Sequence, residues 1–198
     1  MRARLAVHAS GQKVALREIL LRDKAPEFLA ASPKGTVPVL VDQGRVVEQS
    51  LDVMHWALAR ADPENWRAMP AEGSALVERA DGPFKTSLDR YKYASRFDAE
   101  EGDVARDEAR DTAGEFLRDL NAQLSDNIWL FGDHARLADM AILPFVRQFA
   151  HVDRSWFWAQ DWPDLIGWLD RFLASDRFAA IMTKYPKWQA GDPPTQFG

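Results

Sequence analysis

Gln49 and Ser50 stand where a short predicted strand gives way to an amphipathic helix, and at this junction the sequence could hold an anion. Ser50 is a favourable N-cap for the helix predicted over residues 51–61. The first N–H groups of a helix have no intrahelical acceptor and lie at the positive end of its dipole, so they can bind a carboxylate. An ordinary helix cap would account for the same pattern.

Composition excludes several other chemistries. The chain has no cysteine, so its 198 residues hold no cysteine nucleophile, thiolate metal site or disulfide. Its four histidines lack the spacing of metal ligands, and we expect no metal site. The net charge of −5 argues against a nucleic-acid partner. No apolar run reaches membrane-spanning length and no secretory signal is found, so we expect a cytoplasmic protein without membrane association.

The junction belongs to a small module that mixes helices and strands. Pro38 lies near the start of a strand, where it cannot donate to a ladder, which predicts an edge, a strand start or a cis bond. The turn Asp42-Gln43-Gly44 predicts a hairpin. The expected order is helix, strand, helix, strand, strand, helix, over residues 2–9, 14–19, 26–32, 37–41, 45–47 and 51–61.

The remainder of the chain has a helical pattern, and no strand pattern returns. A proline-rich segment, residues 186–198, cannot form a regular helix. We therefore expect an α/β domain over 1–61, a linker over 62–71 and an all-helical domain over 72–198. The helices are expected over residues 70–80, 84–93, 104–124, 137–149, 164–174 and 176–184.

Two stretches resemble the cytosolic glutathione transferases: SPKGTVPVLVDQGRVVEQSLDVMHWAL in the first half and LFGDHARLADMAILPF in the second. The resemblance implies a thioredoxin-like N-terminal domain, of the α/β class, followed by an all-α helical bundle. The opening Met-Arg-Ala-Arg is similar to the residues just after the catalytic turn in the cysteine-type branch of the family. We therefore expect the first strand of the domain and the catalytic turn to be missing from this chain, and to lie upstream in a longer natural protein. The alternative is that the shortened chain is the natural one and that rearrangement or a partner fills the gap.

The resemblance also implies a glutathione site in the first domain. Val37 would pair antiparallel with the cysteinyl part of glutathione, and Pro38 would be cis. Gln49 and Ser50 would hold the γ-glutamyl carboxylate at the helix start. Lys34 would meet the glycyl carboxylate, although a solvated turn lysine explains its presence equally well.

Two residues of the helical half have expected roles. Tyr91 shares a helix face with Phe84, Leu88 and Ser95; by resemblance this region faces the electrophile, and a phenol tolerates a partly wet edge. Asp139 is expected to be structural, as the third helical residue of a capping box. Half of that box is missing, because the cap position is Arg136, whose side chain cannot accept a hydrogen bond.

The expected function is that of a glutathione transferase that uses glutathione as co-substrate and acts on a small electrophile or disulfide, in a homodimer. The reaction needs a thiolate, and lowering a thiol pKa from ~8.5 to ~6.5 takes about 2.7 kcal/mol of anion stabilisation. We expect no catalytic residue for this step within the chain. The alternative is a non-catalytic binding module that is similar to the stringent starvation proteins, which bind RNA polymerase.

Overall fold

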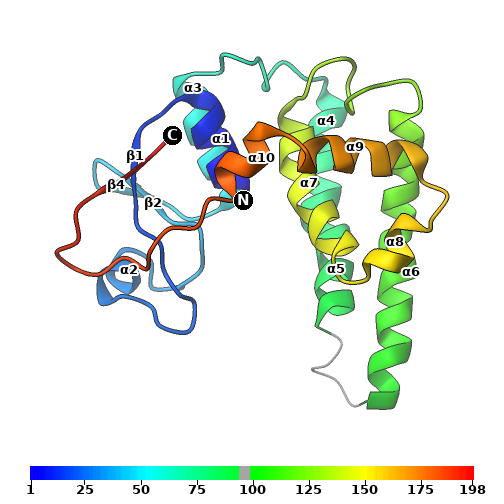
Figure 1. Cartoon of the computed structure of the whole chain (residues 1–198), viewed down its shortest axis with the longest axis horizontal. Coiled ribbons are helices and arrows are strands. Elements are labelled where there is room, and N and C mark those ends of the chain that lie inside the picture. The colour runs from blue at the N-terminus through cyan, green and yellow to red at the C-terminus, as the bar shows by residue number, and fades with distance from the viewer. Residues whose placement is uncertain (94–98) are drawn as a thin grey trace. The chain divides into compact units, whose positions relative to one another are not determined.

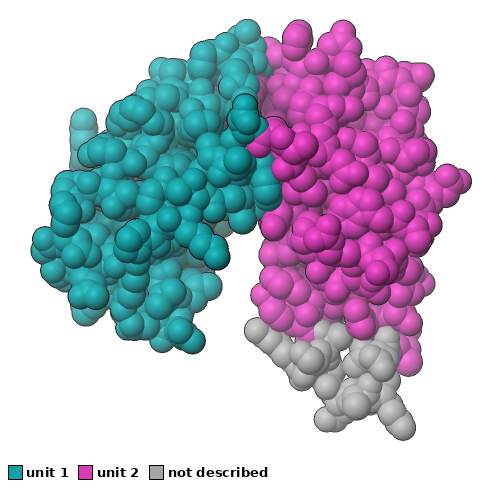
Figure 2. Space-filling model, viewed as in Figure 1, with its two compact units in different colours: residues 1–65, 176–198 teal, residues 66–175 magenta. Residues whose placement is uncertain are grey.

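The computed structural model describes residues 1–93 and 99–198. The chain divides into two compact units (Figure 2). Unit 1 comprises residues 1–65 together with 176–198, and unit 2 comprises residues 66–175. In the part of the chain that is described, no helix is both long and apolar enough to cross a membrane.

The core of unit 1 forms where helix α1 (Arg2–Ser10) packs against helix α3 (Ser50–Arg60). The predicted helix over 2–9 is confirmed, and Gly11 ends it in the left-handed conformation with φ 65°. Two short helices, α2 (Pro26–Ala31) and α10 (Asp176–Ile181), complete the helical part. The buried apolar residues of α1 and α3 are Leu5, Ala6, Val7, Val53, Met54, Ala57 and Leu58.

The four described strands of unit 1 form two antiparallel pairs. The predicted hairpin is confirmed as β2 (Leu40–Asp42) and β3 (Arg45–Val47). Gln43 and Gly44 join them with φ of 48° and 85°, the left-handed conformations that suit a two-residue hairpin loop. The other pair is β1 (Val14–Leu16) with β4 (Thr195–Phe197), in which Val14 lies opposite Phe197.

Strand β4 corrects the expectation that no strand follows residue 61. Figure 1 shows the segment after α10 ending beside β1. Three residues after a proline pair are too short to show an alternating pattern, so only the partner strand identifies them as β-structure. The predicted strand over 14–19 is likewise shorter than expected, and Glu18 instead forms an isolated bridge with Lys187.

Unit 2 is helical, as expected from the sequence. Its central helix α7 is buried along most of its length and packs against α4, α5, α8 and α9. The short helix α8 is absent from the sequence expectations; the Asp153 carboxylate caps it by accepting from Trp156 N at 3.0 Å. The elements are α4 (Ala71–Arg79), η1 (Ala80–Phe84), α5 (Lys85–Lys92), α6 (Ala99–Leu124), α7 (Leu137–Ala150), α8 (Arg154–Trp158) and α9 (Pro163–Leu173).

Asp139 fixes the start of α7 from a fully buried position. Its carboxylate accepts from the backbone N–H of Arg136 at 2.8 Å and of Leu130 at 2.9 Å, and from Trp168 Nε1 at 2.9 Å. The Arg136 side chain makes no capping hydrogen bond, as expected. Burial raises the pKa of the Asp139 carboxyl, against the opposing effect of its donors. The residue is therefore a structural anchor inside unit 2.

Candidate functional site

The five residues predicted to bind glutathione in the first half of the chain all lie in unit 1. They occupy two segments: Lys34, Val37 and Pro38 lie between α2 and β2, whereas Gln49 and Ser50 lie where β3 leads into α3. The two segments meet through one ion pair, since Lys34 Nζ lies 3.0 Å from Glu48 Oε2. The structure therefore brings the turn that contains Lys34, residues 33–35, beside the start of α3.

Glu48 is the residue of this site that sequence reasoning missed. Its carboxylate accepts from the buried Ser32 hydroxyl at 2.5 Å and from Lys34. The Ser32 hydrogen bond, followed by that of Lys34, holds the pKa of Glu48 below its ordinary value. The carboxylate is thus fixed between the end of α2 and the start of α3. In the sequence, the one signal for a role of Glu48 in this site is that an acidic residue directly precedes Gln49.

The Val37–Pro38 peptide bond is cis, as expected. The Val37 residue is 51% exposed, although its side chain is apolar. Nothing in the described parts of the chain hydrogen-bonds to its backbone N–H or C=O. A ligand with an extended peptide backbone can therefore pair with Val37 as an added strand.

The start of α3 differs from the expectation in one respect. The N-cap is Gln49, in an extended conformation with ψ 138°, so the prediction that Ser50 is the cap is wrong. Ser50 is the first helical residue, and its hydroxyl therefore stands at the side of the first turn. No side chain caps α3. The first-turn N–H groups are open to water or to a carboxylate, and the helix dipole favours the latter.

Tyr91 lies in unit 2, on α5, and is only 2% exposed. Its ring centroid is 4.9 Å from that of Phe149, and the Arg106 guanidinium carbon lies 5.3 Å from the ring centroid. Burial raises the pKa of the phenol. The expectation of a partly wet edge is therefore wrong, because side chains from α6 and α7 cover the ring. Ser95, predicted for the same face, lies outside the described residues.

The described residues offer no set of side chains that could bind a metal ion. Across residues 1–93 and 99–198, no group of three or more His, Asp or Glu side chains is arranged to hold a metal ion. The site in unit 1 instead offers a lysine ammonium, an exposed backbone edge and an uncapped helix start. This set suits an anionic ligand with a peptide backbone.

Comparison with protein families gives two matches. Residues 1–66 match the family Glutathione S-transferase, N-terminal domain, and residues 103–171 match Glutathione S-transferase, C-terminal domain. Glutathione S-transferase F10 of Arabidopsis thaliana is 25% identical over 179 residues, which cover 82% of this chain and 80% of the relative. Probable glutathione S-transferase parA of Nicotiana tabacum is 26% identical over 166 residues, which cover 81% of this chain and 69% of the relative.

Solved structures show the same fold. Glutathione transferase F7 from Populus trichocarpa has a TM-score of 0.73 at 18% identity, with 91% of each chain covered. A glutathione transferase family member from Pseudomonas fluorescens, solved with two glutathione bound, has a TM-score of 0.70 at 15% identity, with 90% of this chain and 86% of that chain covered. These likenesses confirm a thioredoxin-like N-terminal domain followed by a helical C-terminal domain. The expected cysteine-type branch stays a prediction.

Proposed function

We propose that this chain, which belongs to the glutathione S-transferase superfamily, binds glutathione in unit 1, the co-substrate that the resemblance implies for reaction with a small electrophile or disulfide. One observation carries the proposal: the Lys34–Glu48 ion pair brings the exposed Val37 segment beside the uncapped start of α3. Relatives of the same fold support glutathione as the ligand, since one was solved with lactoylglutathione and another with an atrazine glutathione conjugate.

Each part of glutathione has a group in unit 1 that suits its chemistry. The backbone of Val37 would pair with the cysteinyl residue. The first turn of α3, with Gln49 and Ser50, would take the γ-glutamyl carboxylate. Lys34 would take the glycyl carboxylate: its ammonium has three donors, so the pair with Glu48 leaves donors for a ligand.

Binding and turnover are separate parts of the proposal. We assign thiol activation to none of the described residues, so the chain is proposed to bind glutathione with little or no catalysis of its own. Tyr91 stays a predicted contact of the electrophile, and a homodimer stays the predicted assembly. Sedimentation tests the latter, because a dimer has twice the 22.4 kDa of the chain.

The test of binding compares glutathione with γ-glutamylcysteine, which lacks the glycyl carboxylate. Calorimetry of the full chain should show binding of both, with glutathione the tighter. Lys34→Gln should weaken glutathione about fivefold to tenfold and leave γ-glutamylcysteine unchanged, because only glutathione carries the group that Lys34 meets. The matched control is Lys92→Gln, in unit 2, which should change neither affinity.

Three outcomes decide the proposal. Absence of glutathione binding by the unmodified chain would overturn it and favour the non-catalytic binding module. Equal loss of both ligands in Lys34→Gln would remove Lys34 from the glycyl end of the site. Turnover of a chlorodinitrobenzene electrophile by the chain at a rate above that of free glutathione would show that a residue of this chain activates the thiol.

A further inference from the structure

The Glu48 carboxylate lies against the lysine that is proposed to meet the glycyl end of glutathione. Lys34 Nζ is 3.0 Å from Oε2 of Glu48, while Oε1 accepts from the Ser32 hydroxyl at 2.5 Å. The Lys34 side chain is 66% exposed and that of Glu48 is 23% exposed, so the lysine is the open member of the pair. A ligand can therefore reach the ammonium from solvent, but it meets a cation whose charge is already offset.

The charge of Glu48 opposes an anionic ligand group at Lys34. The ammonium has three N–H donors, so it can serve a second carboxylate beside that of Glu48. Coulomb energy falls only inversely with distance, and the two carboxylates would lie close together on one ammonium. Their mutual repulsion therefore cancels a large part of the attraction that Lys34 exerts on the ligand.

Ser32 keeps Glu48 beside Lys34. The Ser32 residue is fully buried at the end of α2, and its hydroxyl donates to Glu48. A carboxylate that moved aside would leave this buried donor without its acceptor, which is unfavourable. Glu48 thus stays in place when a ligand arrives, and its charge is a fixed property of the site.

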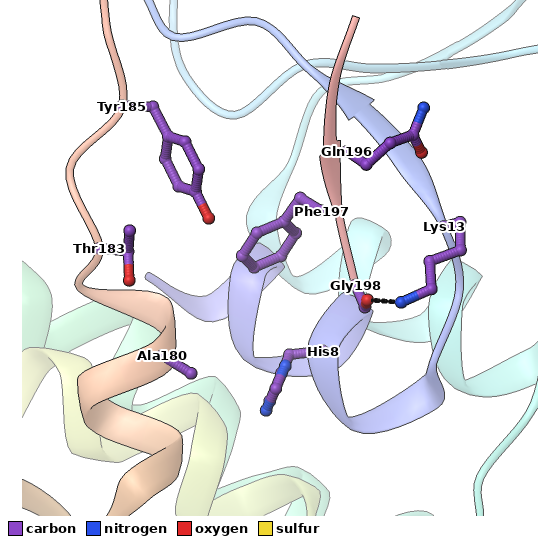
Figure 3. Close-up of a pocket in the computed structure, with 8 residues that line it drawn as sticks. All are labelled: His8, Lys13, Ala180, Thr183, Tyr185, Gln196, Phe197 and Gly198. Carbon is purple, nitrogen blue, oxygen red and sulfur yellow. Dashed lines mark hydrogen bonds between the residues drawn. The ribbon is translucent and has the colours of Figure 1, made fainter.

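The same relation between a lysine and a carboxylate recurs in a separate pocket of unit 1. This pocket lies between the end of α1, the start of β1 and the segment from α10 to β4 (Figure 3). Figure 3 shows the Lys13 ammonium directed to an oxygen of Gly198, which belongs to the carboxylate of the last residue. Lys13 is thereby neutralised, so the pocket offers an anion no advantage over Lys34.

We propose that Glu48 is a specificity-determining residue of the glutathione site, which weakens ligands with an anionic C-terminal end by competing with them for Lys34. The inference rests on the proposed binding of glutathione in unit 1. Lys34 still favours the glycyl carboxylate, but Glu48 reduces this preference. A ligand whose C-terminal end is neutral meets neither the full attraction of Lys34 nor the repulsion of Glu48.

The test compares glutathione with its neutral C-terminal amide, γ-glutamylcysteinylglycinamide, in calorimetric titrations of the full chain. Glu48→Gln should bind glutathione at least about threefold more tightly than the natural chain, because the substitution removes the competing charge and keeps the size of the side chain. Affinity for the amide should stay the same. The matched control is Glu72→Gln, which removes an equal charge from an exposed position of α4 in unit 2 and should change neither affinity.

A second variant reaches the same competition while both charged side chains remain. Ser32→Ala frees Glu48 to turn away from Lys34 and should tighten glutathione by about twofold, again without effect on the amide. Circular dichroism identifies any variant that has lost its fold.

The outcomes separate this inference from the proposed function. Absence of glutathione binding by the natural chain would overturn both. If the natural chain binds glutathione and a folded Glu48→Gln binds it equally or more weakly, only the role of Glu48 is overturned. An equal gain for glutathione and for the amide would also overturn it, because Glu48 would then act on a part of the ligand other than the glycyl carboxylate.

Discussion

The indole Nε1 of Trp168 donates to Oδ1 of Asp139 at 2.9 Å, and both side chains are buried in unit 2. The same oxygen accepts from Leu130 N, while Oδ2 accepts from Arg136 N. Asp139→Ala should therefore lower the free energy of unfolding by about 3 kcal/mol, because three donors lose their acceptor. Asp139→Asn should cost about half as much, since its amide oxygen can still serve Trp168 and Leu130.

Urea denaturation followed by circular dichroism measures these losses. Asp126→Ala is the control, since Asp126 is an exposed aspartate of the same unit. A loss in Asp139→Ala no larger than that of the control would show that the buried carboxylate does not anchor α7.

Glu48 should make the stability of the protein depend on pH in the acid range. Its folded pKa lies below the ordinary 4.5, chiefly through the Ser32 hydrogen bond and then through Lys34. A group with a lowered folded pKa contributes stability above its unfolded pKa and loses that contribution as the pH falls through the folded pKa. The stability difference between the natural chain and Glu48→Gln should thus be present at pH 7 and shrink progressively below pH 4.5.

Carbon-13 NMR titration of the Glu48 carboxyl gives its pKa directly, and urea denaturation at pH 7 and pH 4 gives the difference in stability. The exposed Glu115 supplies the control variant, Glu115→Gln. A Glu48 carboxyl that titrates at or above 4.5 would contradict the hydrogen bonds with Ser32 and Lys34.

Arg4 should control how firmly the segment after α10 is held. Arg4 Nη1 donates to the carbonyls of Ile181 and Thr183 while Nη2 pairs with Glu18, whereas a lysine has a single nitrogen and cannot reach all three acceptors in this geometry. Arg4→Lys should therefore reduce the hydrogen-exchange protection of β4 by about tenfold, and Arg4→Ala should reduce it further. Arg22→Lys, at an exposed site, should leave protection unchanged, and an equal loss in both lysine variants would refute the role of Arg4.

Ser50 should contribute to glutathione affinity even though it is not the cap of α3. Ser50→Ala is expected to weaken binding by about 1–2 kcal/mol, through the loss of one charge-assisted hydrogen bond to the γ-glutamyl carboxylate. Ser74→Ala, at an exposed position of α4, serves as the control in the same calorimetric titration. An unchanged affinity in Ser50→Ala would remove its hydroxyl from the site.

Local signals made much of unit 1 predictable from the sequence. Gly11 ended α1, and Gln43-Gly44 formed the hairpin loop, because each conformation depends on the residue at that position. Pro38 left an edge, a strand start or a cis bond open, and the family resemblance singled out the cis bond that the structure has. Periodicity likewise gave the long helices of unit 2, whose buried faces repeat over several turns.

The features that sequence reasoning missed depend on partners that are distant in the chain. Strand β4 exists only by pairing with β1, and Glu48 acquires its role from Ser32 and Lys34. From the sequence, Tyr91 is an amphipathic side chain that could lie at a wet edge. Only the structure shows that Phe149 and Arg106 cover its ring. A different reason applies to the N-cap of α3. The cap is Gln49 and not the predicted Ser50, and a difference of one residue is too small for periodicity to detect.

The pairing of Val14 with Phe197 sets the order in which the protein can be completed during its synthesis. Strand β1 emerges from the ribosome early, whereas its partner follows only after all of residues 66–175 have been made. About 180 residues separate β1 from β4, so at about 5–20 residues per second β1 keeps an open hydrogen-bonding edge for roughly 9–36 s. Unit 2 can fold during this interval and shorten the loop that β4 must close. Unit 1, which holds the first residues of the chain, is therefore the unit that is finished last.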